Sequence, residues 1–284
     1  MNKLLKQQGL KKSSGLLKTY GVFVFIFLYF PLLIVLIYSF SPTRTIMGMD
    51  GVTLRWYKEL LQDGALLSAF FHSIIVGVSA VFIALVLGTS GAFFLVKVNF
   101  PGKGIFKSMV MLPFLLPGII MGLTLLIFIR LLNIPLSMFT ILLGHVSFTT
   151  PLVMFQISGR LMRMGPNYQF AAQDLGANPV QTFWYVTFPM IKTALIGAGL
   201  LAFTVSFDEI VISYFLTGTW MTLPVYIYGM MRFGLSPKIY AISALVLCFS
   251  LALIILMSRY TGRAGETYKV KNSENKIRNK SNTI

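Results

Sequence analysis

The stretch FAAQDLGANPVQTFWYVTFP, residues 170–189, lies between long apolar runs in a chain of 284 residues. It predicts two short helices, because Gly176 is a typical residue just after a helix, and Asn178 followed by Pro179 is a typical helix start. Upstream, Pro166 marks the start of the first helix. Neither helix is long or apolar enough to cross a membrane. We therefore expect a helical hairpin outside the membrane, in a loop over 159–191.

The composition around this hairpin is that of a membrane protein. Of the residues, 56% are hydrophobic and 11% are charged, and the mean hydropathy is +0.78. A soluble domain has about a quarter of its residues charged, so this chain lacks the polar surface to enclose a soluble core. The net charge of +16 does not indicate nucleic acid, because the basic residues form no single patch interleaved with aromatic residues.

Six apolar runs are each long enough to cross the membrane, which takes roughly 20 helical residues. We predict spans over 21–40, 69–96, 107–131, 138–158, 192–216 and 238–258. We expect Pro113 and Pro117 to bend the third span and Pro151 to bend the fourth. The sequence thus predicts an all-α membrane protein, with one six-helix transmembrane domain over 21–259.

The placement of Lys and Arg predicts the orientation, because loops rich in these residues stay in the cytoplasm. Eighteen of the 24 Lys and Arg residues lie at the two chain ends and in the loops after the second and fourth spans. Both termini and the hairpin are therefore expected on the cytoplasmic side, with basic tails over 1–20 and 260–284, the latter disordered. The first span is followed by no small-x-small cleavage site, so we expect it to remain as an anchor.

Residues 49–67, MDGVTLRWYKELLQDGALL, follow the first span on the opposite side. Their apolar residues recur at near-helical spacing, and Trp56 and Tyr57 are of the types that gather at membrane surfaces. This segment predicts a helix that anchors in the lipid interface.

The sequence carries no motif for chemistry of its own. It contains no GxxxxGK[ST] phosphate loop and no HExxH motif, and its single cysteine, Cys248, excludes an intramolecular disulfide and a cysteine metal cluster. The two histidines, His72 and His145, lie on different predicted spans, and we interpret them as helix contacts rather than a proton relay. We expect no catalysis, no metal and no cofactor in this chain.

The fifth predicted span contains two consecutive acids, in LAFTVSFDEIVISYF over 201–215. A carboxylate at a helix centre costs roughly 2.5–3.5 kcal/mol to insert, so such groups usually face a protein interior or a wet cavity. On a helix, Glu209 shares a polar stripe with Ser206, Ser213 and Thr217, whereas Asp208 points about 100° away from that stripe. The candidate substrate-pathway residues are Ser206, Asp208, Glu209 and Ser213. The alternative is that the acids pair with basic or hydroxyl groups on other helices, and Arg130 is the one strong cation near a span.

The stretch AAQDLGANPVQTFWYVTFP resembles the coupling motif of ABC-importer permeases, Glu-Ala-Ala, three residues, Gly, nine residues, Ile-x-Leu-Pro. Ala171, Ala172 and Gly176 match, and Val186-Thr187-Phe188-Pro189 takes the place of Ile-x-Leu-Pro. The resemblance covers most of the chain and narrows to the second permease of spermidine/putrescine importers. The segments that carry it are RWYKELL, GHVSFTTPLV, FAAQDLGA, LAFTVSFDEIVISYFLTG and LPVYIYGMMRFGLSP.

This resemblance implies a six-helix subunit of the type I ABC importer class in a bacterial cytoplasmic membrane. It implies four partners: a homologous permease, two ATPase subunits that bind ATP and Mg, and an extracytoplasmic binding protein that delivers a polyamine. One alternative keeps this architecture with another cargo, an amino acid or ferric ion. The other is a stand-alone secondary transporter or channel, which predicts an internal repeat or an interrupted helix pair, and neither is evident in the sequence.

One position departs from the motif: Phe170 replaces its glutamate. Buried against an ATPase, this side chain would contribute about 1.5–3 kcal/mol of apolar burial, and Gln169 is placed to substitute in part for the lost acid. The resemblance assigns the coupling role to Phe170, Ala171, Ala172, Asp174, Gly176 and Pro189.

Overall fold

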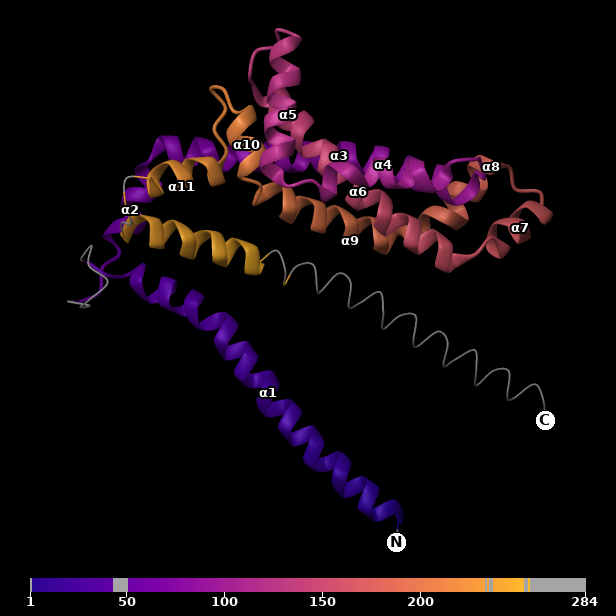
Figure 1. Cartoon of the computed structure of the whole chain (residues 1–284), viewed down its shortest axis with the longest axis horizontal. Helices are drawn as coiled ribbons and strands as arrows, with labels where there is room; N and C mark the ends of the chain where they lie inside the picture. The colour runs from indigo at the N-terminus through magenta and orange to yellow at the C-terminus, as the bar shows by residue number, and fades with distance from the viewer. Residues whose placement is uncertain (1, 43–50, 233, 235–236, 253–254, 256–284) are drawn as a thin grey trace. The chain divides into compact units, whose positions relative to one another are not determined.

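The computed structural model describes residues 2–42, 51–232, 234, 237–252 and 255, and within them every regular element is a helix (Figure 1). The chain divides into two compact units, Met1–Asp63 with Met230–Phe249, and Gly64–Gly229 with Ser250–Ile284. The tail predicted over 260–284 lies outside the described residues.

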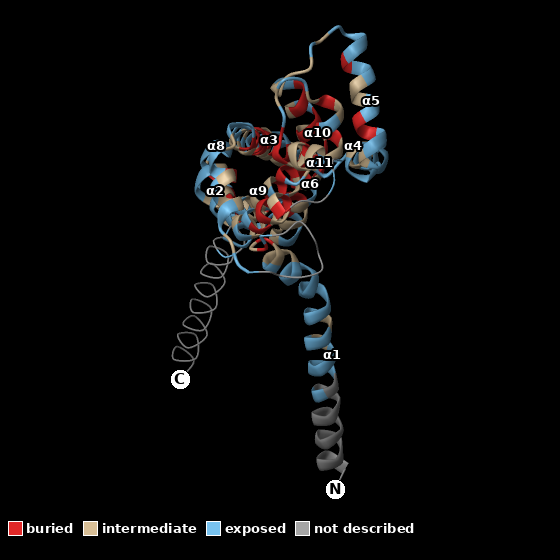
Figure 2. Cartoon of the chain, turned by 90° about the vertical axis from the view of Figure 1, so that its left-hand side faces the viewer, coloured by how far each residue is buried: buried red, intermediate tan, exposed pale blue. Residues whose placement is uncertain are grey.

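The core of the larger unit is formed by α3 (Gly64–Lys97), α6 (Met138–Met164) and α9 (Phe188–Phe207). Figure 2 shows the buried residues along these helices. The buried face of α3 carries small residues three or four positions apart, which lets a neighbouring backbone come close. A Cβ atom added at Gly88 would lie 2.9 Å from the carbonyl oxygen of Thr150 on α6. The small residues on this face are Ala69, Ser73, Gly77, Ala80, Ala84, Gly88 and Ala92.

Four helices are long and apolar enough to cross a membrane: Leu17–Tyr38, Gly64–Lys97, Met138–Met164 and Pro179–Phe207. A bent pair, α4 (Lys103–Leu115) with α5 (Gly118–Leu131), is a fifth candidate. The first of these belongs to α1 (Asn2–Tyr38), which begins well before the predicted boundary. Within the described residues, the predicted sixth span is represented by the shorter apolar helix Pro237–Ala252.

The third predicted span is not one helix. α4 and α5 are bent by 98° at the break between them. The bend expected at Pro117 is therefore confirmed, but it divides the span over 107–131 into two helices, and the expectation of no interrupted helix is wrong. The break follows from Pro117, which has no N–H group and forces the residue before it out of the helical region. Leu116 accordingly has ψ 141°. Pro113 and Pro151, by contrast, lie inside α4 and α6.

The fifth predicted span is also divided differently from the prediction. α8 (Pro179–Thr182), a π-helical turn η1 (Phe183–Thr187) and α9 together form the span Pro179–Phe207. The second half of the hairpin is therefore the beginning of this span, not a separate loop helix. The π turn precedes Pro189, whose ring would collide with the carbonyl four residues earlier in a regular helix. The wider turn, in which Phe188 N–H bonds to the Phe183 carbonyl, avoids that collision.

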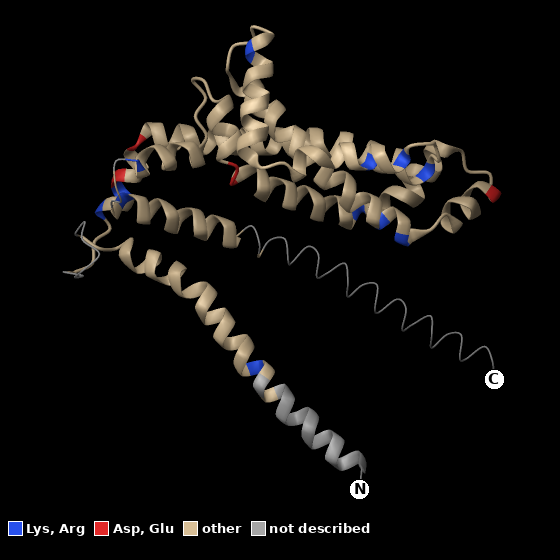
Figure 3. Ribbon diagram, viewed as in Figure 1, with Lys and Arg blue, Asp and Glu red and all other residues tan. Residues whose placement is uncertain are grey.

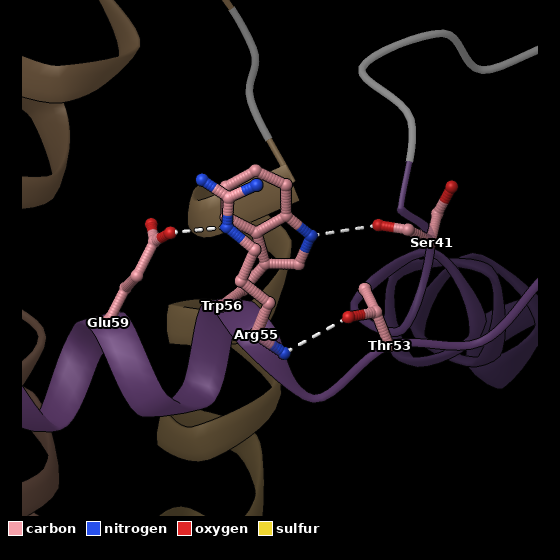
Figure 4. A network of polar contacts seen from close by, with 5 residues as sticks. All are labelled: Ser41, Thr53, Arg55, Trp56 and Glu59. Carbon is pink, nitrogen blue, oxygen red and sulfur yellow. Dashed lines mark hydrogen bonds and ion pairs between the residues drawn. The ribbon is translucent and has the colours of Figure 1, made fainter.

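In the smaller unit, α2 (Arg55–Gln62) is fixed to the residues that follow α1. Figure 4 shows Trp56 Nε1 donating to the Ser41 carbonyl at 2.8 Å, and Arg55 Nε bonding to Glu59 Oε1 at 2.7 Å. Trp56, expected as a lipid anchor, thus also bonds within the fold. The helix predicted over 49–67 is confirmed for Arg55–Gln62, whereas residues 51–54 are not helical and α3 begins at Gly64; residues 49–50 lie outside the described residues.

Candidate functional site

The loop between α6 and α9 contains α7 (Asn167–Asp174), which begins just after Pro166 as predicted. The helix ends in a Schellman motif, with Gly176 N–H bonding to the Gln173 carbonyl at 2.8 Å and Ala177 N–H to the Ala172 carbonyl at 3.0 Å. Gly176 has φ +85°, a conformation that costs glycine little and other residues much more. The predicted helix stop is confirmed.

The start of α8 is fixed by reciprocal hydrogen bonds. Gln181 N–H donates to Asn178 Oδ1 at 2.8 Å, and Asn178 N–H donates to Gln181 Oε1 at 2.9 Å. This capping box confirms the predicted helix start. From α7, Gln169 Nε2 donates to Thr187 Oγ1 at 3.3 Å. The amide expected to replace the missing acid therefore joins α7 to the π turn.

The surface of this loop is apolar and exposed. Phe170 is 58% exposed, Leu175 89% and Tyr185 80%. Phe170 also lines a hollow of about 450 Å³ between α7 and the ends of α3 and α6, together with Phe93, Lys97 and Leu161. On α7, which lies outside the candidate spans, exposed apolar side chains of this kind mark an interaction surface, whereas those of α8 and the π turn belong to the span Pro179–Phe207 and can also face lipid. The exposed large apolar residues of the loop are Tyr168, Phe170, Leu175, Val180, Trp184 and Tyr185.

The other candidate coupling residues lie around this surface. Ala171 and Asp174 are exposed on α7, and Ala172 is half-buried. Pro189 is exposed in the first turn of α9. Figure 3 shows Lys and Arg gathered at the same end of the larger unit as α7 and α8. The helices that meet at this end carry Lys97 in α3, Lys103 and Lys107 in α4, Arg160 and Arg163 in α6, and Lys192 in α9.

The two acids lie at a break between helices rather than within one. α9 ends at Phe207, and α10 (Val211–Leu216) begins after Ile210. Glu209 Oε1 accepts a hydrogen bond from Ile212 N–H at 2.9 Å, so this carboxylate caps the start of α10, where a negative charge is favourable. The prediction of a continuous helix through both acids is therefore wrong, because the side chain takes over an N–H that the helix would have used.

Asp208 differs from Glu209 in its surroundings. Asp208 is exposed, whereas Glu209 is half-buried. Within the described residues, the Asp208 carboxylate has no hydrogen bond or ion pair, and Arg130 at the end of α5 pairs with neither acid.

Ser206 and Ser213 share one face, as the stripe predicts, but that face is turned toward α6. His145 Nδ1 lies 2.7 Å from Ser206 Oγ, and His145 Nε2 lies 2.8 Å from Ser213 Oγ. All three side chains are at most 3% exposed. The interpretation of His145 as a helix contact is confirmed. The last member of the stripe, Thr217, donates to the Trp220 carbonyl in the next loop.

α10 is held on two further sides. Thr140 Oγ1 on α6 lies 2.9 Å from the Leu216 carbonyl, the last residue of α10. A Cβ atom on Gly122 of α5 would lie 2.7 Å from the Phe215 ring, and one on Gly118 would lie 3.5 Å from Val211 Cβ. The break in the third span therefore lies next to the break in the fifth.

The comparisons with known proteins agree with this architecture. Residues 80–263 match the family described as "Binding-protein-dependent transport system inner membrane component". The chain belongs to this family. Over 231 residues, this permease is 39% identical to the putrescine transport system permease protein PotI of Escherichia coli, a match covering 78% of this chain and 82% of the relative. It is 31% identical to the spermidine/putrescine transport system permease protein PotC of Escherichia coli, in a match that covers 82% of this chain and 88% of that relative.

Solved structures show the fold of the permease. A chain of a bacterial ABC transporter that imports the acidic polysaccharide alginate superposes with a TM-score of 0.63 and 19% identity, covering 87% of this chain and 95% of that one. A chain of an amino acid ABC transporter superposes with a TM-score of 0.57 and 16% identity, and the match covers 75% of this chain and 100% of that one. The permease therefore has the helical fold of ABC transporter membrane subunits, and its relatives are transport proteins.

The sequence interpretation missed the contact between His145 and the two serines. A signal was present: Ser206 and Ser213 are two helical turns apart on one face of an apolar segment, and buried hydroxyl groups need partners. His145 lies inside a predicted span and has two polar ring atoms. To predict that His145 contacts these two serines, one must know how α6 is aligned against α9, and helix periodicity does not give that alignment.

Proposed function

We propose that this permease forms half of the membrane pathway of an ATP-driven polyamine importer. The observation that carries the proposal is the similarity, over most of the chain, to two permeases named for putrescine and spermidine/putrescine transport. The complex would contain a homologous second permease, two ATPases that bind ATP and Mg, and an extracytoplasmic binding protein. The permease would cross the membrane six times, with both termini in the cytoplasm.

The loop between α6 and α9 is the proposed docking site for an ATPase. Its exposed aromatic and aliphatic residues supply apolar area for a partner, and its capped helix ends make it a rigid element. Phe170, exposed beside the hollow, would insert into the ATPase surface as an apolar contact in place of the motif's glutamate. The basic residues at this end support a cytoplasmic location.

Asp208 is the proposed point of attraction for the cationic substrate. Its carboxylate is exposed and unpaired within the described residues, and it follows the C-terminal end of α9, where the helix dipole adds negative potential. Interrupted helices with such ends form cation sites in other transporters. A neutral amino acid gains little from this charge, so the site favours a di- or tri-cation over that alternative cargo.

The test is uptake of radiolabelled putrescine and spermidine by the complete complex in proteoliposomes, with ATP inside. We expect Asp208→Asn to reduce uptake strongly and Glu209→Gln to reduce it less, since an amide oxygen can still cap α10. Glu59→Gln is the matched control, because it removes an exposed carboxylate on α2. Undiminished uptake in both acid variants would rule out their role in the pathway.

The two rivals are tested by the same preparation. Transport by the purified permease alone, without ATPases, would favour a secondary transporter, for which the interrupted helices now give some support. Failure of excess unlabelled polyamine to compete, with competition by an amino acid or by ferric ion instead, would overturn the polyamine assignment and leave the architecture in place.

A further inference from the structure

His145 bridges the break in the fifth span. Ser206 lies at the end of α9, before the break, and Ser213 lies in α10, after it. The imidazole contacts the first hydroxyl with Nδ1 and the second with Nε2. One side chain of α6 therefore joins both sides of a point where the helix has lost its regular hydrogen bonds.

One arrangement of the protons satisfies all of these groups. Ser213 Oγ lies 3.0 Å from the Glu209 carbonyl and can donate its proton to it. A hydroxyl has one proton, so in this arrangement Ser213 accepts from His145 Nε2–H. In a neutral imidazole the other nitrogen is then an acceptor, and Ser206 donates to Nδ1. Every polar atom of the ring is satisfied, and the carbonyl of Glu209 is held by the same chain of bonds.

We propose that His145 is a positioning residue that sets the orientation of Asp208 and Glu209. The torsion angles of residues 208–210 determine where the two carboxylates point, and His145 fixes the helix ends on both sides of them. The inference has two parts. The effect of His145 on transport rests on the proposed function. The effect of His145 on the geometry of the break does not, because all the residues of the bridge belong to this chain.

The two parts are tested by separate measurements. For the geometry, Asp208→Cys is made in a Cys248→Ala background, and its reaction with a membrane-impermeant methanethiosulfonate is timed in the assembled complex. For transport, KM and Vmax of polyamine uptake are measured with Asp208 intact. Each measurement is repeated with His145→Ala and with His72→Ala as the matched control. His72 bonds through one nitrogen to the Met221 carbonyl, in the loop after α10.

We expect His145→Ala to change the labelling rate by about tenfold and to lower Vmax/KM by about tenfold, since two buried hydrogen bonds are lost. His72→Ala should change neither quantity by more than about twofold. An unchanged labelling rate in His145→Ala would overturn the proposal, whatever happens to transport. A changed labelling rate with normal uptake would support the positioning of the break by His145, overturn the importance of that positioning for transport, and leave the polyamine assignment standing.

Two further variants cover the case in which His145→Ala fails to assemble. His145→Gln retains a donor and an acceptor, and we expect it to restore part of both quantities. The triple variant His145→Leu, Ser206→Ala, Ser213→Ala removes the imidazole and both hydroxyls together, so none of these three buried groups is left without a partner, and only the half-buried Glu209 carbonyl loses a hydrogen bond. It should therefore assemble more readily than His145→Ala. Normal labelling in the triple variant would also overturn the proposal.

Discussion

The close contact between α3 and α6 predicts that Gly88→Ala destabilises the permease while the same change elsewhere does not. The added Cβ would lie 2.9 Å from the Thr150 carbonyl oxygen and 2.9 Å from Val153 Cβ. Both groups belong to α6, and a backbone carbonyl cannot turn aside as a flexible side chain does. The two helices must therefore separate locally, which costs about 1–3 kcal/mol for an overpacked core.

Two control substitutions isolate that cost. At Gly197 on α9 a Cβ meets nothing within 4 Å, so Gly197→Ala should show only the gain in helix propensity, about 1 kcal/mol. At Gly91 the nearest atom, at 2.7 Å, is Met154 Sδ, and a methionine side chain can move. We therefore expect Gly91→Ala to fall between the other two.

The assay is thermal unfolding of the detergent-purified permease, followed by the remaining monomer peak in size-exclusion chromatography. An added cost of about 2 kcal/mol should lower the midpoint of Gly88→Ala relative to Gly197→Ala by roughly 4–8 °C. Equal midpoints for these two variants would show that α3 and α6 do not approach as closely as the structure indicates, and the reasoning would fail.

Three other substitutions test the loop and the break. Gly176→Val forces a β-branched residue to φ +85°, so it should cost about 1–3 kcal/mol and weaken ATPase co-purification without preventing membrane insertion; full co-purification would contradict this. Phe170→Ala removes an exposed apolar contact and should lower ATPase affinity about tenfold in a titration of the complex, whereas unchanged affinity would exclude Phe170 from the interface. Thr140→Val removes a buried hydroxyl that lies 2.7 Å from the Ser137 carbonyl and 2.9 Å from the Leu216 carbonyl and that accepts from Ser137 N–H, so it should lower stability by about 1–3 kcal/mol in the unfolding assay; a neutral effect would show that these contacts do not stabilise the permease.

The features that could be predicted from the sequence are those set by neighbouring residues. Gly176 ends α7 and Asn178 begins α8, as expected, because the hydrogen bonds of each cap lie within five residues. The long apolar runs predicted the spans of α3 and α6 because a membrane span is also recognised from consecutive residues, through their mean hydropathy. The helix ends around the candidate coupling residues were therefore predicted correctly, and the coupling role of these residues stays a prediction.

The features that could not be predicted depend on distant residues. Pro113, Pro117 and Pro151 give the same local signal, but among these three positions the chain breaks only at Pro117, where α5 turns to pack on α10. The break at Asp208 is bridged by His145, 61 residues away from Ser206. Helix periodicity placed Ser206 and Ser213 on one face but gave no information about which helix that face would meet.

The span Pro179–Phe207 is long enough that a small tilt at one end moves the other end by several ångströms. It contains 29 residues, so at 1.5 Å per residue it is a rod of about 44 Å. One end is the capped start at Asn178, and the other end adjoins Asp208. A tilt of about 5° about either end displaces the opposite end by about 4 Å, more than the length of a hydrogen bond. If the span moves as a rod, a small displacement at its Asn178 end would therefore be enough to make or break a contact between Asp208 and a bound cation.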